Sequence, residues 1–432
     1  MIKYLSFLIL IFFLSHCSLS PKNSFWSQKI KIEQDKETEK LFKTEKILKK
    51  EFNSDLKITL KSKLIKSNFT NNLTNNNGRV GYNGKLKSKT KFKFSKIDLF
   101  DESEPEIIFD KGSVIFFNNK GTVLRFNNSS KLEWKTNIYT KSEKKLKPIL
   151  FFTKNNDILI VADTISKYYA LDIKTGKLLW VKNNVAPFNS QLKIYKGNFF
   201  VIDFENTLRS YSIINGEEIW NVKTEKSFAR SKKKLSLVIL DKLIYFNNSL
   251  GDVSAVNMEN GNLIWQTPTQ SNLMAKDSFK LKTSDLIANN DTIIFSNNNN
   301  EFFSLDSNNG AINWKQDINS NLRSTIIDDL IFSITMKGLM VISEIESGNI
   351  IRITDIFSEY NKKKKSDIVP VGFIVGEYNA YVTTNNGRLI VLNISTGKTI
   401  LVLKIDNEKI SRPFVLGQNL FIIKDNAIIK LD

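Results

Sequence analysis

The residue types that most often carry chemistry in enzymes and metal sites are scarce in this sequence. Its single cysteine and single histidine, Cys17 and His16, are neighbours near the N-terminus. No disulfide can form within the chain, and no zinc site of Cys and His ligands and no His-dependent triad can be assembled. The remaining candidates are Asp172, Asn257 and Asp306, which end apolar segments just before expected turns. Such side chains commonly stabilise the turn itself, and a catalytic carboxylate is the alternative.

The chain is strongly basic, and its basic residues are mostly lysine. The 432 residues include 63 Lys and Arg, only 8 of them Arg, against 44 Asp and Glu, a formal net charge of +19. Between Pro21 and Phe100, 20 basic residues stand against 8 acidic ones, a net charge of +12. We favour a lysine-coated, solvated surface, and contact of this basic region with an anionic membrane surface is the alternative. The 41% of hydrophobic residues suffices for a substantial core.

The N-terminus has the pattern of a secretion signal. Lys3 precedes an unbroken apolar run, Phe7 to Leu14, which is too short to span a bilayer comfortably. The end of this run resembles a bacterial lipoprotein signal, in which the cysteine becomes the lipidated first residue, although His16 stands where that pattern has a small residue. We expect residues 1–16 to be a signal peptide and Cys17 to carry the lipid, with ordinary signal cleavage or an uncleaved anchor as alternatives. Residues 17–104 then form a basic N-terminal region.

A hairpin pattern recurs through the rest of the chain. In Val253–Gln266 an apolar strand leads through a polar turn at Gly261 into a second strand with Trp265. The equivalent pairs are Ser130 with Trp134, Gly176 with Trp180, Gly216 with Trp220, Gly310 with Trp314, Gly348 with Arg352 and Gly397 with Leu401. Successive positions of the second member are 46, 40, 45, 49, 38 and 49 residues apart. Because two further apolar strands precede each hairpin, this period predicts the four-stranded blade of a β-propeller.

Counting the strand pairs upstream of the turns gives eight units within residues 105–432. The eighth, Pro413 to Asp432, has three strands, so its fourth strand has to come from elsewhere in the chain. We predict an all-β fold, an eight-bladed β-propeller of four-stranded antiparallel blades whose ring is closed by an N-terminal strand, which removes the last open sheet edge. The first candidate for that strand is Leu56–Leu60 and the second is Phe92–Ile97, because both alternate apolar and polar residues.

The repeats carry five tryptophans at the equivalent position: Trp134, Trp180, Trp220, Trp265 and Trp314. One indole at a fixed place in each blade buries a large apolar area between neighbouring sheets, and its removal typically costs about 3 to 5 kcal/mol. We therefore assign the tryptophans to packing rather than to ligand binding. Arg352 and Leu401 replace the aromatic in the next two units, where we expect the contact between blades to be less well specified.

The repeat resembles a known propeller repeat. The spacing of Ala170, Asp172, Gly176 and Trp180 is similar to the pyrroloquinoline-quinone-like (PQQ-like) repeat, and Val253–Gln266 resembles a repeat of the lipoprotein family of the outer-membrane barrel-assembly machinery. This resemblance implies a non-enzymatic scaffold without a cofactor, lipid-anchored at the periplasmic face of the outer membrane. The partners that it implies are the periplasmic domains of the barrel-inserting subunit and unfolded outer-membrane proteins.

The same resemblance implies a docking surface in the loops on either side of Val253–Gln266. An apolar-x-Arg element before this blade corresponds to Phe228 and Arg230, and a Ser-Asp element after it corresponds to Ser284 and Asp285. Solvated loop residues without a partner are the alternative at these positions.

Two other function classes are compatible with the repeat. Quinoprotein dehydrogenases with this repeat hold a quinone in the central funnel with a calcium ion, a catalytic Asp and commonly a disulfide between adjacent cysteines, which this chain cannot form. A binding module for an anionic envelope ligand, such as polysaccharide or lipid head groups, is the third class. Export argues against nucleic acid as that ligand. We favour the scaffold because binding an extended client strand at a sheet edge requires no catalytic group.

Overall fold

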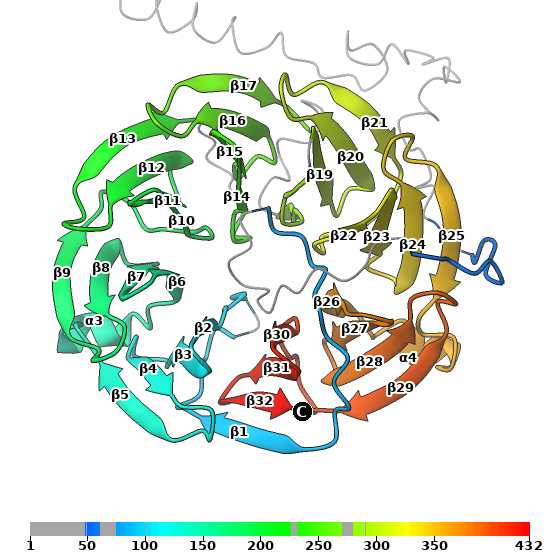
Figure 1. The fold of residues 1–432 in the computed structure, drawn as a ribbon, viewed down its shortest axis with the longest axis horizontal. Coiled ribbons are helices and arrows are strands. Elements are labelled where there is room, and N and C mark those ends of the chain that lie inside the picture. Colours follow the sequence, from blue (N-terminus) through cyan, green and yellow to red (C-terminus); the bar gives the residue numbers. More distant parts are fainter. Residues whose placement is uncertain are drawn as a thin grey trace, which may run out of the picture. The chain divides into compact units, whose positions relative to one another are not determined.

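The computed structural model describes residues 48, 50–60, 75–100, 102–225, 231–269, 280–289 and 291–432. In this part of the chain, eight four-stranded antiparallel sheets form a ring. Figure 1 shows the sheets as blades around a central axis, with the strands of each blade ordered from the axis outward. The prediction of an all-β, eight-bladed β-propeller is therefore confirmed.

The first blade comprises β2 (Ile108–Asp110), β3 (Ser113–Phe117), β4 (Val123–Phe126) and β5 (Leu132–Thr136), and the second comprises β6 (Leu150–Asn155), β7 (Ile158–Asp163), β8 (Lys167–Asp172) and β9 (Leu178–Asn183). The third comprises β10 (Lys193–Tyr195), β11 (Asn198–Ile202), β12 (Thr207–Ser212) and β13 (Glu218–Lys223), and the fourth comprises β14 (Leu237–Leu240), β15 (Leu243–Asn247), β16 (Val253–Asn257) and β17 (Leu263–Thr267). The fifth blade comprises β18 (Ile287–Asn289), β19 (Thr292–Asn297), β20 (Glu301–Asp306) and β21 (Ile312–Gln316), and the sixth comprises β22 (Thr325–Ile327), β23 (Leu330–Ile334), β24 (Leu339–Glu344) and β25 (Ile350–Asp355). The seventh comprises β26 (Pro370–Val375), β27 (Asn379–Thr384), β28 (Arg388–Asn393) and β29 (Thr399–Lys404), and the eighth comprises β30 (Phe414–Leu416), β31 (Asn419–Lys424), β32 (Ala427–Leu431) and β1 (Lys89–Lys93). Two short helices, α3 (Lys141–Lys145) and α4 (Lys362–Lys365), lie in connections between blades.

The burial of a strand follows its place in the blade. The inner strands are covered on both faces by neighbouring blades, and in β7, with the sequence ILIVAD, every residue after Ile158 is buried. In the outermost strand β9, with the sequence LLWVKN, most residues are exposed. Strands that are covered on both faces need nearly continuous apolar sequence, which is why the inner strands can be recognised in the sequence as apolar runs.

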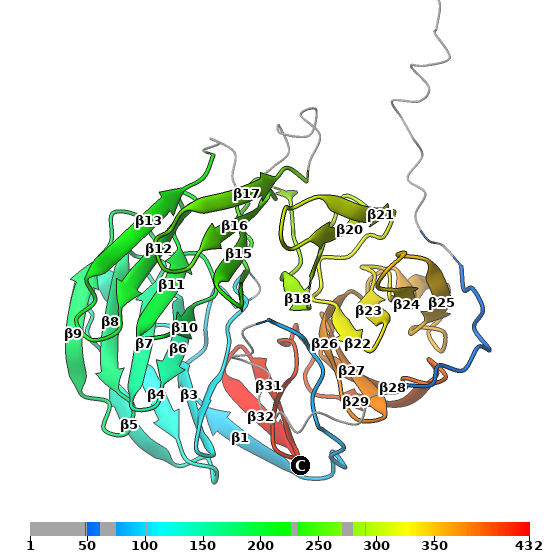
Figure 2. The same ribbon diagram turned by 45° about the horizontal axis from the view of Figure 1, so that its top comes forward.

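The strand that closes the ring is β1. It pairs antiparallel with β32 along its whole length, so the eighth blade takes its outermost strand from the N-terminal region (Figures 1 and 2). Our first candidate for this strand, Leu56–Leu60, is wrong, and the second candidate is the right region, with the strand beginning at Lys89 rather than at Phe92. The side chain of Phe92 gives the reason, because it is fully buried whereas Leu56 is 42% exposed.

Each tryptophan of the repeats packs on the turn glycine of the following blade, not on the glycine of its own hairpin. A Cβ atom on Gly176 would lie 2.6 Å from the ring of Trp134, and one on Gly310 would lie 2.5 Å from Trp265. In four blades the indole Nε1 also donates to a carbonyl oxygen of the following blade at 2.9 to 3.1 Å: Trp134 to Ile173, Trp180 to Ile213, Trp265 to Ser307 and Trp314 to Ile345. Glycine and tryptophan are thus the two sides of one contact between blades.

Arg352 takes the place of the tryptophan in the sixth blade. We expected a less well specified contact between blades at this position, and the structure shows a well-defined one. Its side chain is fully buried, and Nη2 donates to Ile394 O over 2.9 Å. Nη1 donates to Leu56 O over 2.8 Å and also contacts Ser395 O. The guanidinium therefore specifies this contact through hydrogen bonds. Leu401, at the next equivalent position, has no polar group and is 39% exposed.

The predicted signal peptide and Cys17 lie outside the described residues, so signal cleavage and lipidation stay predictions. None of the helices in the described part of the chain has the length and apolar character that crossing a membrane requires. The division into residues 17–104 and 105–432 also stays a prediction, although the ring itself draws its closing strand from the first of these regions.

Candidate functional site

The centre of the ring contains a funnel at the face where the chain enters the innermost strands. A cavity of about 580 Å³ lies there, and the segments that lead into β2, β14, β18, β22, β26 and β30 line it. Basic side chains outnumber acidic ones in this lining by seven to three: Lys232, Lys233, Lys234, Lys282, Arg323, Lys409 and Arg412 against Glu102, Glu104 and Asp285. The funnel is therefore a positively charged cavity in the middle of the molecule.

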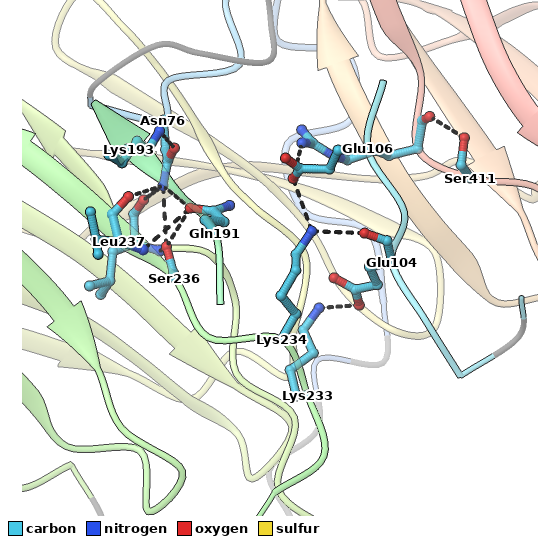
Figure 3. Close-up of polar contacts among 12 residues, drawn as sticks. Asn76, Glu104, Glu106, Gln191, Lys193, Lys233, Lys234, Ser236, Leu237 and Ser411 are labelled. Atoms are coloured by element: carbon cyan, nitrogen blue, oxygen red, sulfur yellow. Dashed lines mark hydrogen bonds and ion pairs between the residues drawn. The ribbon is translucent and has the colours of Figure 1, made fainter. Parts of the chain in front are cut away.

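Glu104 and Glu106, which precede β2, hold a network of ion pairs in the funnel (Figure 3). Lys234 Nζ donates to Glu106 Oε1 over 3.0 Å and to Glu104 O over 2.8 Å. Lys233 Nζ contacts Glu104 Oε1, and Arg412 Nη2 donates to Glu106 Oε1 over 2.7 Å. These contacts join the first, fourth and eighth blades across the funnel.

The basic partners keep both carboxylates charged. Burial opposes the ionised form of Glu104, but the charges of Lys233 and Lys234 outweigh it and lower the pKa of Glu104 to about 2. Water nevertheless reaches this residue through the funnel, since 44% of its side chain is exposed. Burial also opposes the charge of Glu106, and Lys234 and Arg412 hold its pKa well below the usual range. A general acid or base would need a pKa near neutrality, so neither carboxylate is suited to that role.

Asn76 ties three blades together deeper in the ring (Figure 3). Its side chain is buried, and Nδ2 lies 3.0 Å from Gln191 Oε1, 3.3 Å from Leu237 O and 3.1 Å from Leu286 O. Lys193 Nζ donates to Asn76 Oδ1 over 2.6 Å. Burial lowers the pKa of Lys193 to about 7, although Glu106 acts in the opposite direction, so the lysine is only partly charged at neutral pH.

From Asn76 the chain runs to the face opposite the funnel. Val80 N donates to Val375 O over 2.9 Å at the end of β26, whereas the start of β26 lines the funnel. Asn83 N donates to Gln418 Oε1 in the turn between β30 and β31. Figure 1 shows this segment crossing from the centre of the ring toward β1. The N-terminal segment, residues 75–84, thus crosses the centre of the ring, from the starts of β14 and β18 at Asn76 to the end of β26 at Val80.

The outermost strands form the second notable surface, because they present apolar side chains to solvent. These side chains are 39% to 57% exposed: Leu132 on β5, Leu178, Leu179 and Val181 on β9, Ile219 on β13, Leu263 and Ile264 on β17, Ile312 on β21, and Ile400 and Leu401 on β29. At β25 the outer edge is occupied by the chain itself. Phe52 N donates to Ile353 O over 3.1 Å, and Ile353 N donates to Phe52 O over 2.8 Å. The edge of this blade therefore pairs with one residue of another segment through two main-chain hydrogen bonds, before that segment turns away at Asn53.

Two of the four residues that the resemblance implies for docking, Phe228 and Arg230, lie outside the described residues. Ser284 is 4% exposed, and its hydroxyl donates to Asp285 O and accepts from Ser296 N, so it fixes the backbone before β18. Asp285 is 8% exposed and lines the funnel. The structure thus places Ser284 and Asp285 beside the funnel, and their contact with a partner stays a prediction.

The three polar residues that end strands are turn residues. Asp172, Asn257 and Asp306 each accept, through Oδ1, a hydrogen bond of 2.7 to 2.9 Å from a backbone N–H two or three residues further along. The interpretation that they stabilise turns is confirmed. In the described part of the chain, no group of three or more His, Cys, Asp or Glu side chains is placed to hold a metal ion.

Sequence reasoning missed most of the residues that fill the centre of the ring. They are Asn76, Glu104, Glu106, Lys193 and Arg323. None of them belongs to the repeated hairpin, and each lies in the N-terminal segment or within a few residues of the first strand of a blade. The only signal in the sequence is a charged or amide residue next to such a short first strand.

Comparison with known proteins identifies the family of this chain. The profile of the family described as "Outer membrane protein assembly factor BamB" matches residues 103–354, which is more than half of the chain. The chain belongs to this family. The resemblance to the PQQ-like repeat and to the barrel-assembly lipoprotein is thereby confirmed. No curated protein matches the sequence.

Solved structures with the same fold as this BamB-family chain include a BamB protein and two dehydrogenases. BamB from Moraxella catarrhalis has a TM-score of 0.61 at 14% identity, over 79% of this chain and 100% of that one. Quinohemoprotein alcohol dehydrogenase from Comamonas testosteroni has a TM-score of 0.62 at 9% identity, over 85% and 81%. A europium-containing methanol dehydrogenase has a TM-score of 0.61 at 11% identity, over 83% and 89%. At these identities the likeness shows the fold alone.

The dehydrogenases raise the question of a quinone and a metal in the funnel. The carboxylates of Glu104 and Glu106 are bonded to lysine and arginine side chains, which compete with a metal for the same oxygen atoms. Glu102 and Asp285 are the other carboxylates in the lining, and the described residues provide no set of three metal ligands. Metal ions that support a quinone need several such oxygen ligands, so these residues do not fit a calcium-dependent quinone site.

Proposed function

We propose that this BamB-family protein is a non-enzymatic envelope scaffold that assists the assembly and insertion of outer-membrane β-barrel proteins. The observation that carries the proposal is the main-chain bridge between Phe52 and Ile353, because it shows that a blade edge can pair with another segment through backbone hydrogen bonds. Unfolded β-barrel proteins consist of segments with alternating apolar residues. Such a segment can satisfy its backbone at a strand edge while its apolar side chains cover the exposed residues of the outer strands.

Membership of the family supports the partner as well as the role. The partner that we propose is the barrel-inserting subunit, contacted through its periplasmic domains by Phe228, Arg230, Ser284 and Asp285. A lipid on Cys17 would hold the propeller at the periplasmic face of the outer membrane. The basic N-terminal region would add attraction to anionic lipid head groups, up to about 1 kcal/mol for each lysine near the surface.

Photocrosslinking tests the contact with clients. A photoreactive residue at Leu179 or Ile264, which are both 49% exposed on outer strands, is expected to capture an unfolded outer-membrane protein. The control position is Lys120, an exposed residue in the turn between β3 and β4. Equal capture at Lys120, or equal capture of a folded soluble protein, would show that the outer strands do not select extended clients.

Co-purification tests the contact with the machinery. The solubilised protein should bring the barrel-inserting subunit with it, and charge reversal by Arg230→Glu or Asp285→Lys should weaken this contact while Lys177→Glu, an exposed turn position, leaves it unchanged. Thermal unfolding of each variant shows whether it is folded. If the native protein co-purifies with no outer-membrane component, the assembly role is wrong whatever the fold.

Membrane attachment has its own test. Cys17→Ser is expected to move the protein from the membrane fraction to the soluble fraction. Deletion of residues 21–50 should weaken attachment in low salt if the basic region touches the membrane, and unchanged attachment would remove that contact from the proposal.

A further inference from the structure

Two arginines in the funnel have guanidinium nitrogens without a hydrogen-bond partner. Nη2 of Arg323 and Nη1 of Arg412 are buried, and neither makes a hydrogen bond in the described part of the protein. Arg323 is 8% exposed, and the hydroxyl of the adjacent Ser324, which is 2% exposed, is also without a partner. A buried polar group that stays unpaired costs about 1 to 3 kcal/mol, and more when it is charged. Such donors call for ordered water or for a group that is not part of the chain, and their place in the lining of one cavity favours a bound group.

The surroundings of these donors favour an anion. Arg323 and Arg412 precede β22 and β30, and both line the same cavity, in which basic residues outnumber acidic ones by seven to three. They lie near enough for the charge of Arg412 to lower the pKa of Arg323, after the larger effect of burial, to about 10. Glu106 neutralises Arg412 in part through Nη2, and Nη1 has no hydrogen-bond partner among the described residues. Two planar guanidinium groups with free N–H donors match the geometry of a carboxylate or another oxyanion.

Apolar side chains also line the funnel. Met336 and Val371 are half-buried there, whereas Phe100 and Phe373 belong to the core and are only 4% and 2% exposed. The cavity volume of about 580 Å³ lies within the range of small-molecule sites, roughly 300 to 1,000 Å³. A bare inorganic ion would leave this apolar surface uncovered, whereas a ligand that joins an acid to an apolar body would cover it.

We propose that the funnel binds a small carboxylate with an apolar body, whose acid group is held by Arg323 and Arg412 and whose apolar part packs on Met336 and Val371. The N-terminal segment crosses the centre of the ring between Asn76 and Val80, so the ligand enters from the face on which the funnel lies. This site is separate from the blade edges but shares Asp285 with the proposed docking surface, so it is tested on the protein without its partner, where the scaffold role does not affect the outcome.

Calorimetry on the solubilised full chain tests the site with three probes. The first is 3-phenylpropionate, the second is the neutral 3-phenylpropan-1-ol, and the third is inorganic phosphate. We expect saturable binding of one 3-phenylpropionate per chain, and binding of the alcohol and of phosphate that is weaker by roughly tenfold or more, since each lacks one of the two interactions. Absence of saturable 3-phenylpropionate binding, or equally tight binding of phosphate or of the alcohol, would overturn the proposal.

Arg323→Met separates a ligand contact from a structural role. It keeps most of the side-chain volume and removes a buried donor that has no partner, so the melting temperature should stay the same or rise while the affinity for 3-phenylpropionate falls roughly tenfold or more. Lys177→Met, at an exposed turn position, should change neither quantity. A folded Arg323→Met variant that binds the carboxylate as tightly as the wild type would exclude this arginine from the site, and a large loss of melting temperature would assign it to the fold.

Discussion

The guanidinium of Arg352 donates to the carbonyl oxygen of Ile394 over 2.9 Å, in the same place where an indole of another blade, such as that of Trp134, donates to the carbonyl of the blade that follows. Its second nitrogen donates to Leu56 O over 2.8 Å and contacts Ser395 O. One side chain therefore joins β25, the following blade and the segment of residues 50–60. Burial lowers the pKa of Arg352 to about 10, which still leaves it charged at neutral pH.

Arg352→Met should destabilise the ring. The variant keeps the packing volume but leaves the oxygens of Leu56, Ile394 and Ser395 without their donor, and we expect a loss of about 3 kcal/mol in the free energy of unfolding measured with urea. Leu401→Ala is the control, because this side chain is 39% exposed and its truncation should cost about 1 kcal/mol or less. Equal losses for the two variants would mean that the hydrogen bonds of Arg352 do not hold the blades together.

The glycine under each indole provides a second prediction. Gly176 has a φ of +71°, and a Cβ atom there would lie 2.6 Å from the ring of Trp134. Gly197 has a φ of +84° with no atom within 4 Å of such a Cβ, so Gly197→Ala measures the backbone effect alone, about 1 kcal/mol. Gly176→Ala adds the clash and should cost about 3 kcal/mol in total by urea denaturation. A similar cost for both variants would show that the indole can move aside.

The repeat could be predicted from the sequence because each blade needs the same apolar inner strands and the same turn. What the sequence could not show is which blade a repeated residue contacts. Gly176 stands four residues before Trp180 in one hairpin, yet it packs on Trp134 of the preceding blade. A periodic sequence is equally compatible with both pairings, and only the packing of neighbouring sheets decides between them. The replacement of an indole by Arg352 could be read from the sequence, but the carbonyl oxygens that the guanidinium contacts could not, for the same reason.

The centre of the ring was harder to predict than the blades. Glu106, Lys234 and Arg412 come from the first, fourth and eighth blades, and they meet because those blades start at the axis. No period connects such residues, since each occupies a position outside the repeated hairpin. Long-range contacts of this kind depend on the closure of the ring, which in turn depends on a strand from the N-terminal region.

Lys193 should make stability depend on pH. Burial lowers its pKa in the folded protein to about 7, and the ordinary value of about 10.5 applies in the unfolded chain. Between these two values the unfolded state binds more protons, so this group makes the free energy of unfolding rise with pH. The difference between the wild type and Lys193→Met should therefore increase by about 2 kcal/mol in favour of the wild type from pH 7 to pH 9. Urea denaturation at several pH values measures it, and a difference independent of pH would contradict the shift.

Asn76→Asp should loosen the N-terminal segment. The amide nitrogen of Asn76 lies 3.1 Å from Leu286 O and 3.3 Å from Leu237 O, and a carboxylate oxygen in its place would repel both, with Lys193 compensating in part. We expect a loss of about 2 to 3 kcal/mol in stability and faster hydrogen exchange in residues 75–84. Asn83→Asp makes the same substitution at an exposed position of the same segment and should change neither. Slow exchange that persists in Asn76→Asp would mean that other contacts hold the segment.

Closure of the ring by β1 can be tested against the rejected alternative. The ring of Phe92 is fully buried, with its centroid 5.9 Å from that of Phe126 in the first blade and 6.2 Å from that of Phe421 in the eighth. Phe92→Ala removes this contact on both sides of the closing strand and should cost about 3 to 5 kcal/mol. Leu56→Ala, in the segment that does not close the ring, should cost about 1 kcal/mol or less because Leu56 is 42% exposed. If urea denaturation shows a larger loss for Leu56→Ala than for Phe92→Ala, the segment of residues 50–60, rather than β1, is the main N-terminal contribution to the stability of the ring.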